Sequence, residues 1–234
     1  MDTPILFLIF NRPETEQRVF EVIKKIKPAE LYIAADGPRK GKESENEKCL
    51  RARKIIDNGI DWKCNVHKLY RVENLGCKIA VSSAIDWFFD NVDEGIILED
   101  DCLPDPSFFA YCSELLKKYR YESNVMHIGS NNFQDGINRG DGSYYFSKYS
   151  HIWGWATWGR AWKKYSINTI VDRERYLNSV NTKFSNILEK IYWESLFWCV
   201  NHNLLNTWDI QWLFSIWLNN GICISPNKNL VINI

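Results

Sequence analysis

Short apolar runs alternate with amphipathic segments from Pro4 to about Leu98, and this alternation restricts the fold more than any other feature of the sequence. The apolar runs cover residues 5–10, 31–35, 66–70 and 95–98. Between them, helical spacing predicts a helix that starts at Pro13 and further helices over 43–58 and 78–91. Strands that alternate with helices predict an α/β fold with a mostly parallel central sheet flanked by helices.

The pattern changes after residue 101. Asp105 can cap a helix that begins at Pro106, and strands are predicted over 125–128 and 144–146. Further helices are expected near 157–164, 182–201 and 208–219. Because no linker or repeat interrupts the chain, we expect one domain over residues 1–234 with a helical C-terminal lobe.

Charge and cysteine content narrow the functional classes. Lysine plus arginine and aspartate plus glutamate both number 29, so no overall field favours nucleic acid or an anionic membrane as a partner. The seven cysteines are scattered and lack zinc-site spacing. No apolar stretch approaches the roughly 20 residues that span a bilayer, and no signal peptide is apparent. We therefore expect a cytoplasmic protein without a membrane span.

Polar residues follow three predicted strands directly. They are Asn11-Arg12, Asp36-Gly37 and the acidic motif Glu99-Asp100-Asp101. Ligands bind at the carboxyl ends of strands in open sheets of this kind. Three successive carboxylates repel one another, and a Mg²⁺ or Mn²⁺ ion shared with a diphosphate would offset that repulsion. The alternative is an acidic turn that leads into the helix capped by Asp105.

Several segments together resemble a known enzyme family. The sequence ILEDDCLPDPSFF (97–109) resembles bacterial nucleotide-diphospho-sugar transferases with the GT-A fold, and its acidic motif is similar to that of animal N-acetylglucosaminyltransferases with EDD in place of the commoner DXD. The other matching segments are PILFLIFNRP (4–13), AADGPR (34–39), NLGC (74–77), HIWGWATWGRAW (151–162) and WDIQW (208–212). The resemblance spans nearly the whole chain and implies a metal-dependent hexosyl- or N-acetylhexosaminyltransferase of polysaccharide biosynthesis.

The resemblance also assigns the two halves of the domain. Residues 1–101 would bind the nucleotide-diphosphate sugar, and residues 102–234 would bind a glycan, a lipid-linked glycan or another hydroxyl acceptor. Asp101 would be the direct ligand of Mn²⁺ or Mg²⁺, Asp100 would contact the ribose or sugar, and Glu99 would lie at the base of the site. The remaining implied donor contacts are Phe10, Asn11 and Arg12 beside the nucleotide, Asp36 at the base or ribose, and Arg39 and Lys78 at the diphosphate. Solvated surface charge is the alternative for Arg12, Arg39 and Lys78.

A second acidic site would supply the catalytic base of an inverting transfer. Asp209 in TWDIQW matches the family's downstream acid, although Thr207 or Asp209 could simply cap the helix that begins there. Glu194 in YWESLFW is the fallback. We expect inversion, while no motif excludes retention.

Four of the eleven tryptophans lie in one glycine-containing stretch. Trp155, Trp158 and Trp162 have helical spacing and are expected in the core, whereas Trp153 and Gly154 precede that helix and could wall the donor-sugar or acceptor pocket. Asn131 and Asn132 could hydrogen-bond a sugar or form a turn. His151 and His202 are expected to be structural.

The sequence departs from the family pattern at one expected metal ligand. Two functions other than glycosyl transfer also stay open. No histidine follows His202 to serve as a further metal ligand, so a truncated chain, a further domain after residue 234 or a water molecule is expected there. A sugar nucleotidylyltransferase would ordinarily carry a glycine-rich basic loop after its first strand, and residues 10–13 form none. A catalytically silent carbohydrate-binding module is the alternative outside enzymology.

Overall fold

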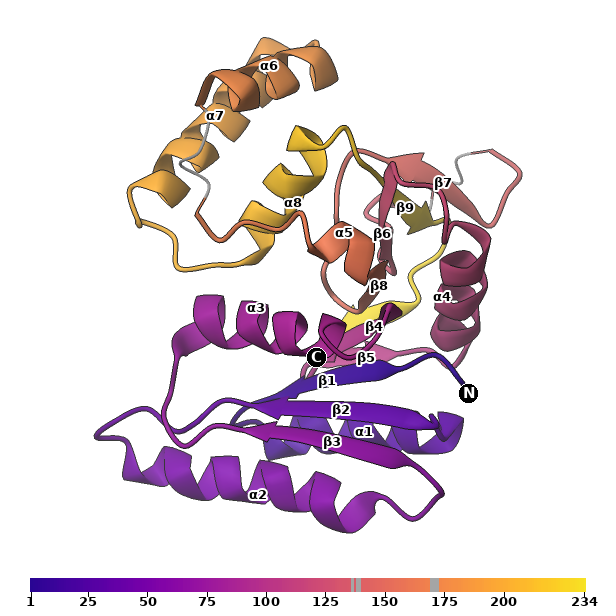
Figure 1. Ribbon diagram of the computed structural model, residues 1–234, viewed down its shortest axis with the longest axis vertical. Coiled ribbons are helices and arrows are strands. Elements are labelled where there is room, and N and C mark those ends of the chain that lie inside the picture. The colour runs from indigo at the N-terminus through magenta and orange to yellow at the C-terminus, as the bar shows by residue number, and fades with distance from the viewer. Residues whose placement is uncertain (136, 138–139, 169–172) are drawn as a thin grey trace.

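The computed structural model describes residues 1–135, 137, 140–168 and 173–234, which form one large sheet and one small ribbon (Figure 1). The large sheet has the strand order β3-β2-β1-β4-β8-β6-β9-β7, and the ribbon pairs β5 with β10. The strands are β1 (Ile5–Ile9), β2 (Glu30–Ala35), β3 (Asn65–Tyr70), β4 (Glu94–Glu99), β5 (Cys102–Pro104), β6 (Val125–Gly129), β7 (Tyr144–Ser147), β8 (Trp155–Trp158), β9 (Ile222–Pro226) and β10 (Val231–Asn233).

The first four strands of the large sheet are parallel, as the alternating pattern predicts. β1 pairs with β2 on one side and with β4 on the other, and β2 pairs with β3. All five residues of β1 are buried, which fits a central strand covered by helices on both faces. The helices are α1 (Pro13–Ile26), α2 (Glu43–Gly59), α3 (Gly76–Phe89), α4 (Ser107–Lys118), α5 (Gly159–Trp162), α6 (Arg173–Lys183), α7 (Ile187–Asn201) and α8 (Asp209–Leu218).

Alternate residues of β1 point into two different cores. Ile5 and Phe7 pack in one core with α1, α2 and α4, whereas Leu6 and Leu8 pack in the other with α3, α5, α6, α7 and α8. Helices therefore cover both faces of the sheet, and α6, α7 and α8 extend as a lobe beyond it (Figure 1). These observations confirm the predicted α/β architecture with its helical C-terminal lobe.

The tryptophan stretch forms a strand where the sequence predicted the start of a helix. β8 runs antiparallel to both β4 and β6, so that Ile97 and Ile128 lie on either side of it. Trp155 and Trp158 then point to opposite faces, one into each core. The predicted burial of these side chains is confirmed, but the predicted helix is reduced to α5, because spacing of three residues also suits a strand buried on both faces.

Two other helix predictions were wrong in their limits. The helix predicted over 182–201 corresponds to α7, which starts later, and only its first two predicted residues lie at the end of α6. The Asn186 side chain accepts a hydrogen bond from the Leu188 amide where α7 begins. Pro106, not Asp105, is the N-cap of α4, and the helix starts at Ser107, one residue later than predicted; the Ser107 amide still donates to the Asp105 carboxylate at 2.8 Å. β5 and β9 were not predicted.

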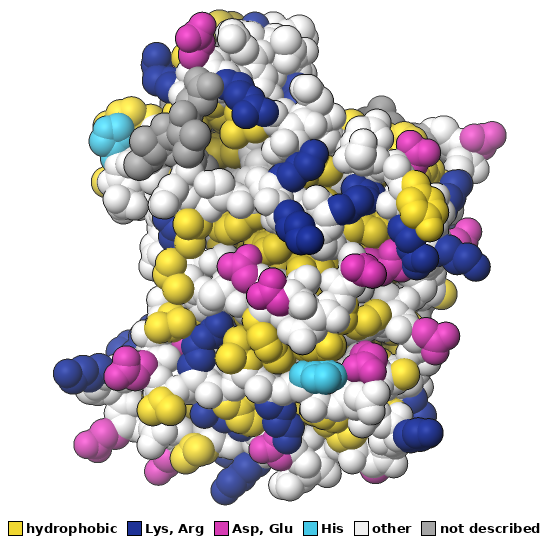
Figure 2. Space-filling model, in the orientation of Figure 1, with side chains coloured by type: hydrophobic (Ala, Val, Ile, Leu, Met, Phe, Trp, Pro, Cys, Tyr) yellow, Lys and Arg dark blue, Asp and Glu magenta, His cyan; other side chains and the backbone are white. Residues whose placement is uncertain are grey.

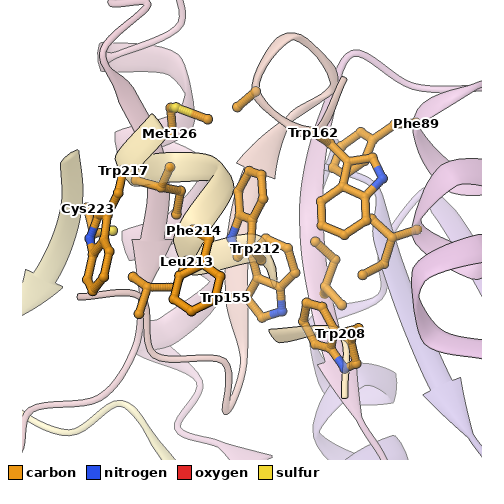
Figure 3. Packing of buried hydrophobic residues seen from close by; sticks show 14 of the residues in the cluster. Phe89, Met126, Trp155, Trp162, Trp208, Trp212, Leu213, Phe214, Trp217 and Cys223 are labelled. Atoms are coloured by element: carbon orange, nitrogen blue, oxygen red, sulfur yellow. The ribbon is translucent and has the colours of Figure 1, made fainter. Parts of the chain in front are cut away.

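Aromatic side chains fill the core between the sheet and the C-terminal lobe (Figure 3). Trp155 stacks on Trp208 with ring centroids 5.8 Å apart and lies 5.9 Å from Trp212. We call the set of Trp155, Trp162, Trp208, Trp212, Phe214 and Trp217 the aromatic core. It fixes α8 against β8.

Acidic and basic side chains are interspersed with apolar ones on the face of the molecule seen in Figure 2. None of the helices in the described part of the chain is long and apolar enough to cross a bilayer.

Candidate functional site

The carboxyl ends of β1, β2 and β4 border a cavity of about 470 Å³ together with the start of α3. We call it the donor cavity, after the role that the sequence predicts for the residues around it. Seven of the residues singled out from the sequence line it, namely Phe10, Arg12, Asp36, Arg39, Glu99, Asp100 and Asp101. Parallel strands end at the same edge of the sheet, so residues distant in the sequence meet there. Its inner wall is apolar and includes Leu8, Ala34, Ala80 and Val81.

The acidic motif is held by a nearby arginine and by the backbone. Arg12 Nη1 lies 2.5 Å from Asp101 Oδ2 and 3.4 Å from Asp100 Oδ1. The Phe10 amide donates to Asp100 Oδ2 at 3.2 Å. The repulsion expected among the three carboxylates is therefore partly offset by Arg12. Because the Arg12 side chain is 54% exposed, it can leave Asp101 at little cost when another cation arrives.

Burial and neighbouring negative charges favour protonation within this motif. Burial, followed by the charges of Asp101, Asp100 and Asp209, raises the pKa of Glu99 to about 8. Burial also raises the pKa of Asp100 to about 6, although the charge of Arg12 opposes the shift. A cation placed among these groups would lower both pKa values and recover the ionised carboxylates.

The chemistry of the acidic motif suits a divalent metal that shares its ligands with phosphate. Within the described ranges, no three or more His, Cys, Asp and Glu side chains are grouped so as to hold a metal ion. Mg²⁺ characteristically uses one or two carboxylates and completes its coordination with phosphates and water. Asp101 lines the cavity and fits that arrangement, and its role as metal ligand stays a prediction.

Arg39 and Asn11 hold the start of α2 near Phe10. Both side chains donate to the buried carboxylate of Glu45, Asn11 at 2.9 Å and Arg39 through Nε at 3.0 Å. The hydrogen bonds from Arg39 lower the pKa of Glu45 to about 2. Arg39 also lies over the Phe10 ring at 5.8 Å. Arg39 borders the donor cavity, whereas Asn11 is engaged with Glu45 outside its lining.

Asp36 is engaged at the start of α3. Its carboxylate accepts hydrogen bonds from the amides of Leu75 and Gly76 at 3.0 and 3.2 Å, and from Asn74 Nδ2 at 2.9 Å. These partners explain why the chain turns from β3 into α3 at Gly76, where φ is +75°. Asp36 lines the cavity, and its contact with a ribose or base stays a prediction.

Arg71 is a cavity residue that the sequence analysis missed. It follows β3 directly, as Asp36 follows β2, and its Nη2 donates to Ser83 Oγ on α3 at 2.9 Å. Burial lowers its pKa, and Asp36 opposes that shift. Arg12 and Arg39 form ion pairs with carboxylates, but Arg71 forms none within the described part of the chain. The signal for Arg71 was its position immediately after a predicted strand.

Lys78 and Asp209 lie beside the donor cavity and do not line it. Lys78 is in the first turn of α3, next to the cavity residue Cys77. Asp209 begins α8, and its carboxylate accepts a hydrogen bond from Thr207 Oγ1. The charge of Asp209 raises the pKa of Glu99 and of Cys77, which places it on the acidic side of the cavity. Asn206, just before α8, completes the wall.

The fallback base Glu194 is elsewhere. It lines a second cavity of about 570 Å³ between α6 and α7, together with Arg173, Leu177 and Trp198. His202 also lines that cavity and bonds the Trp198 carbonyl through Nδ1 at 2.8 Å, which is a structural contact. The structure therefore does not bring Glu194 to the acidic motif.

Asn131, Asn132 and Gly154 have internal roles. Asn131 Nδ2 donates to the Val231 carbonyl at 2.9 Å, and Asn132 Nδ2 donates to the Pro226 carbonyl at 2.9 Å. Gly154 has a φ of +73°, and a Cβ there would lie 2.8 Å from Val231 Cγ2. These residues pack the end of the chain against β4, and the structure does not bring the Asn131 amide to the donor cavity.

Comparison with known proteins finds only distant structural likenesses. No protein-family description and no curated protein matches it. Among solved structures, the galactosyltransferase LgtC in complex with donor and acceptor sugar analogs matches with a TM-score of 0.47 at 10% identity, over 94% of this chain and 72% of that one. An apo UDP-glucose pyrophosphorylase matches with a TM-score of 0.48 at 10% identity, over 100% and 93% of the two chains.

A third solved structure has another activity. The 4-diphosphocytidyl-2C-methyl-D-erythritol synthase of Anaerococcus prevotii matches with a TM-score of 0.43 at 10% identity, over 86% of this chain and 98% of that one. Likenesses of this strength do not decide an activity. The strand order and the two cores define the fold of this chain.

Proposed function

We propose that the chain is a metal-dependent glycosyltransferase that binds a nucleotide-diphosphate sugar in the donor cavity. The observation that carries the proposal is the meeting of an acidic motif with three guanidinium groups, those of Arg12, Arg39 and Arg71, around one cavity at the carboxyl ends of parallel strands. A nucleotide sugar offers matching parts, because its diphosphate is anionic, its ribose carries hydroxyls and its base is flat and largely apolar.

A divalent metal would be held by Asp101, with Asp100 and Glu99 close by, and would offset negative charge on the diphosphate when bound. The chain's own residues do the rest. Arg12 would exchange its contact with Asp101 for one with phosphate oxygens, since both are charge-assisted hydrogen bonds. Arg71 would donate to the nucleotide sugar through its guanidinium group, while Asp36 keeps the start of α3 in place.

Asp209 is the proposed general base of an inverting transfer. The acceptor hydroxyl oxygen would bond to the anomeric carbon while the bond from that carbon to the diphosphate oxygen breaks, and its electron pair leaves with the nucleotide. The hydroxyl proton passes to the Asp209 carboxylate. The location of Asp209 on the acidic side of the donor cavity supports this role. A retaining transfer would give a product with the same anomeric configuration as the donor, and Asp209 would then not be the general base.

Calorimetric titration with nucleoside diphosphates, with and without Mn²⁺, tests donor binding. Asp101→Ala should weaken metal-dependent binding by about 100-fold or more, because the ion loses its direct protein ligand. Asp90→Ala is the matched control, since that exposed aspartate is remote from the cavity lining. Equal affinity in the wild type and Asp101→Ala would contradict the metal assignment.

A second measurement separates binding from chemistry. Asp209→Asn should keep donor affinity and lose about 10²- to 10⁴-fold in transfer rate, because the proton acceptor is removed. Product anomers determined by NMR distinguish inversion from retention. Sugar binding without any nucleotide affinity would favour the catalytically silent carbohydrate-binding module, and release of pyrophosphate from a sugar phosphate and a nucleoside triphosphate would favour a nucleotidylyltransferase.

A further inference from the structure

Two large aromatic side chains form an exposed corner on the surface. Phe133 is 55% exposed and Trp153 is 40% exposed. Their ring centroids are 5.6 Å apart and their planes meet at 73°. The His151 ring lies 4.8 Å from Phe133 at a similar angle. The other tryptophans of this stretch are buried, so the exposure of Trp153 is a local exception.

The corner lies next to the acidic motif. β8 runs antiparallel to β4 with Trp155 opposite Ile97, so the residues just before β8 lie near the end of β4, where the acidic motif begins. The packing of Gly154 supports this placement, because a Cβ at Gly154 would lie 3.1 Å from Leu98 Cδ2, in the residue just before the motif. Trp153 is not among the residues that line the donor cavity.

Internal hydrogen bonds hold the backbone of the corner. Ser130 Oγ donates to the Trp153 carbonyl at 2.6 Å. The buried His127 imidazole bonds the His151 carbonyl through Nε2 at 3.0 Å, while its Nδ1 accepts from Trp212 Nε1 at 3.2 Å. Because an indole only donates and a carbonyl only accepts, His127 is neutral with its proton on Nε2. A surface held in this way binds without a large cost in ordering.

We propose that Phe133 and Trp153 form the binding site for a saccharide ring of the acceptor. Aromatic rings offer flat apolar faces that cover the C–H faces of a pyranose. The assignment of this saccharide to the acceptor rests on the proposed function. The inference goes further by naming a carbohydrate as the acceptor class.

His151 supplies the polar part of this corner. Burial lowers its pKa, so the imidazole is neutral at pH 7, and one ring nitrogen donates while the other accepts. Sugar hydroxyls also both donate and accept, so the neutral ring matches them in either direction. A cation at the same place would instead favour a phosphate or an acidic peptide.

The test uses the full chain and a glycan array with terminal hexose, N-acetylhexosamine and deoxyhexose residues as the probe. Wild type should bind at least one class of terminal sugar, and Trp153→Ala and Phe133→Ala should each weaken that binding about tenfold. Trp153→Phe, which keeps a ring, should recover part of the loss. Matched controls are Trp198→Ala and Tyr121→Ala, because both side chains are exposed at other sites.

Two further readouts decide the outcome. Melting temperatures of the variants should stay within a few degrees of wild type, since the replaced rings are exposed. Calorimetry should show unchanged nucleoside diphosphate affinity in the variants. If the wild type did not bind a nucleoside diphosphate, the proposed function would be overturned, but the saccharide site would not. The saccharide site would be overturned if no glycan bound, if both alanine variants bound glycans as wild type does, or if the corner bound phosphatidylglycerol vesicles in place of glycans.

Discussion

The donor cavity and the aromatic core lie against the same sheet but differ in the polarity and exposure of their side chains. Around the cavity, partly exposed arginines pair with more deeply buried carboxylates, as Arg12 does with Asp101 and Arg39 with Glu45. In the aromatic core, rings exclude water and the polar atoms are few. The difference teaches that the first region can exchange its internal partners for a ligand, whereas the second fixes the position of α8. Substitutions should therefore change binding in one region and stability in the other.

Trp155→Ala should give the largest change in stability. Trp155 is fully buried between His127, Trp208 and Trp212, so its removal leaves a cavity in the aromatic core. The free energy of unfolding in urea should fall by about 3–5 kcal/mol. Trp155→Phe should cost less, because part of the ring volume remains. A loss of under about 1 kcal/mol for the alanine variant would break the contrast between the two regions.

Glu16 is an exception to the pairing seen around the donor cavity. Its side chain is fully buried in α1 and neither carboxylate oxygen has a hydrogen-bond partner within the described residues. Burial, and then the charge of Asp100, raises its pKa to about 8. The folded state therefore holds this proton more tightly than the unfolded state, so its contribution to stability is complete below about pH 4 and is lost as the pH rises through 8.

Glu16→Gln should remove that loss. The variant should gain about 4 kcal/mol over wild type on going from pH 4 to pH 8, as measured by urea denaturation at each pH. Glu14→Gln is the control, because Glu14 lies on the exposed side of the same helix. If the free energy of unfolding depended on pH in the same way for wild type and Glu16→Gln, ionisation of Glu16 would not destabilise the folded state.

His127 is a buried polar side chain that stacks on Trp155 of the aromatic core, and both of its ring nitrogens are hydrogen-bonded. Burial lowers its pKa to about 3. Because the unfolded state binds the proton more tightly, the contribution of the neutral ring is complete above about pH 6.5 and is lost as the pH falls toward 3. Wild type should lose about 2 kcal/mol between pH 7 and pH 5 from this group.

His127→Gln tests this assignment, since a glutamine can make similar hydrogen bonds without titrating. Its unfolding free energy should change less than that of wild type over the same pH interval. His67→Gln serves as the control, because His67 is partly exposed and pairs with Glu30. An equal dependence on pH in wild type and His127→Gln would place the acid sensitivity elsewhere.

Arg71→Gln should have the smallest effect and act on binding alone. The loss of one charge-assisted hydrogen bond should weaken nucleoside diphosphate binding about tenfold, or about 1.4 kcal/mol. The melting temperature should change little, because Arg71 forms only the bond to Ser83 on α3 among its described side-chain contacts. Arg51→Gln, which alters an exposed pair with Glu14, is the control. A large loss of stability with unchanged affinity would assign Arg71 to the scaffold.

The N-terminal half was predictable because each strand was short, apolar and followed at once by polar residues. Strand ends of a parallel sheet share one edge, so the sequence pattern alone assigned Arg12, Asp36 and Asp101 to one site. The hydrogen-bond partners of the charged side chains were not predictable. Glu45 is one of several acidic residues in a charged helix, and only the fold shows that it accepts from Arg39 and Asn11.

The C-terminal half was harder to predict because tryptophan spacing suits several structures. Trp155 and Trp158 are compatible with one helix face or with the two faces of a strand, and only the pairing of β8 with β4 and β6 decides between them. Phe133 carried no local signal, since its neighbour Trp153 is remote in sequence.

The ribbon of β5 and β10 has a consequence for the order in which the molecule assembles. β10 pairs with β5 directly after the acidic motif, and the Ile234 amide donates to the Asp101 carbonyl at 2.9 Å. Contacts between segments so far apart along a chain form late, because loop closure must precede them. During synthesis, the backbone at Asp101 therefore gains this partner only when residue 234 has left the ribosome, so the nascent chain carries its acidic motif without the ribbon that later steadies it.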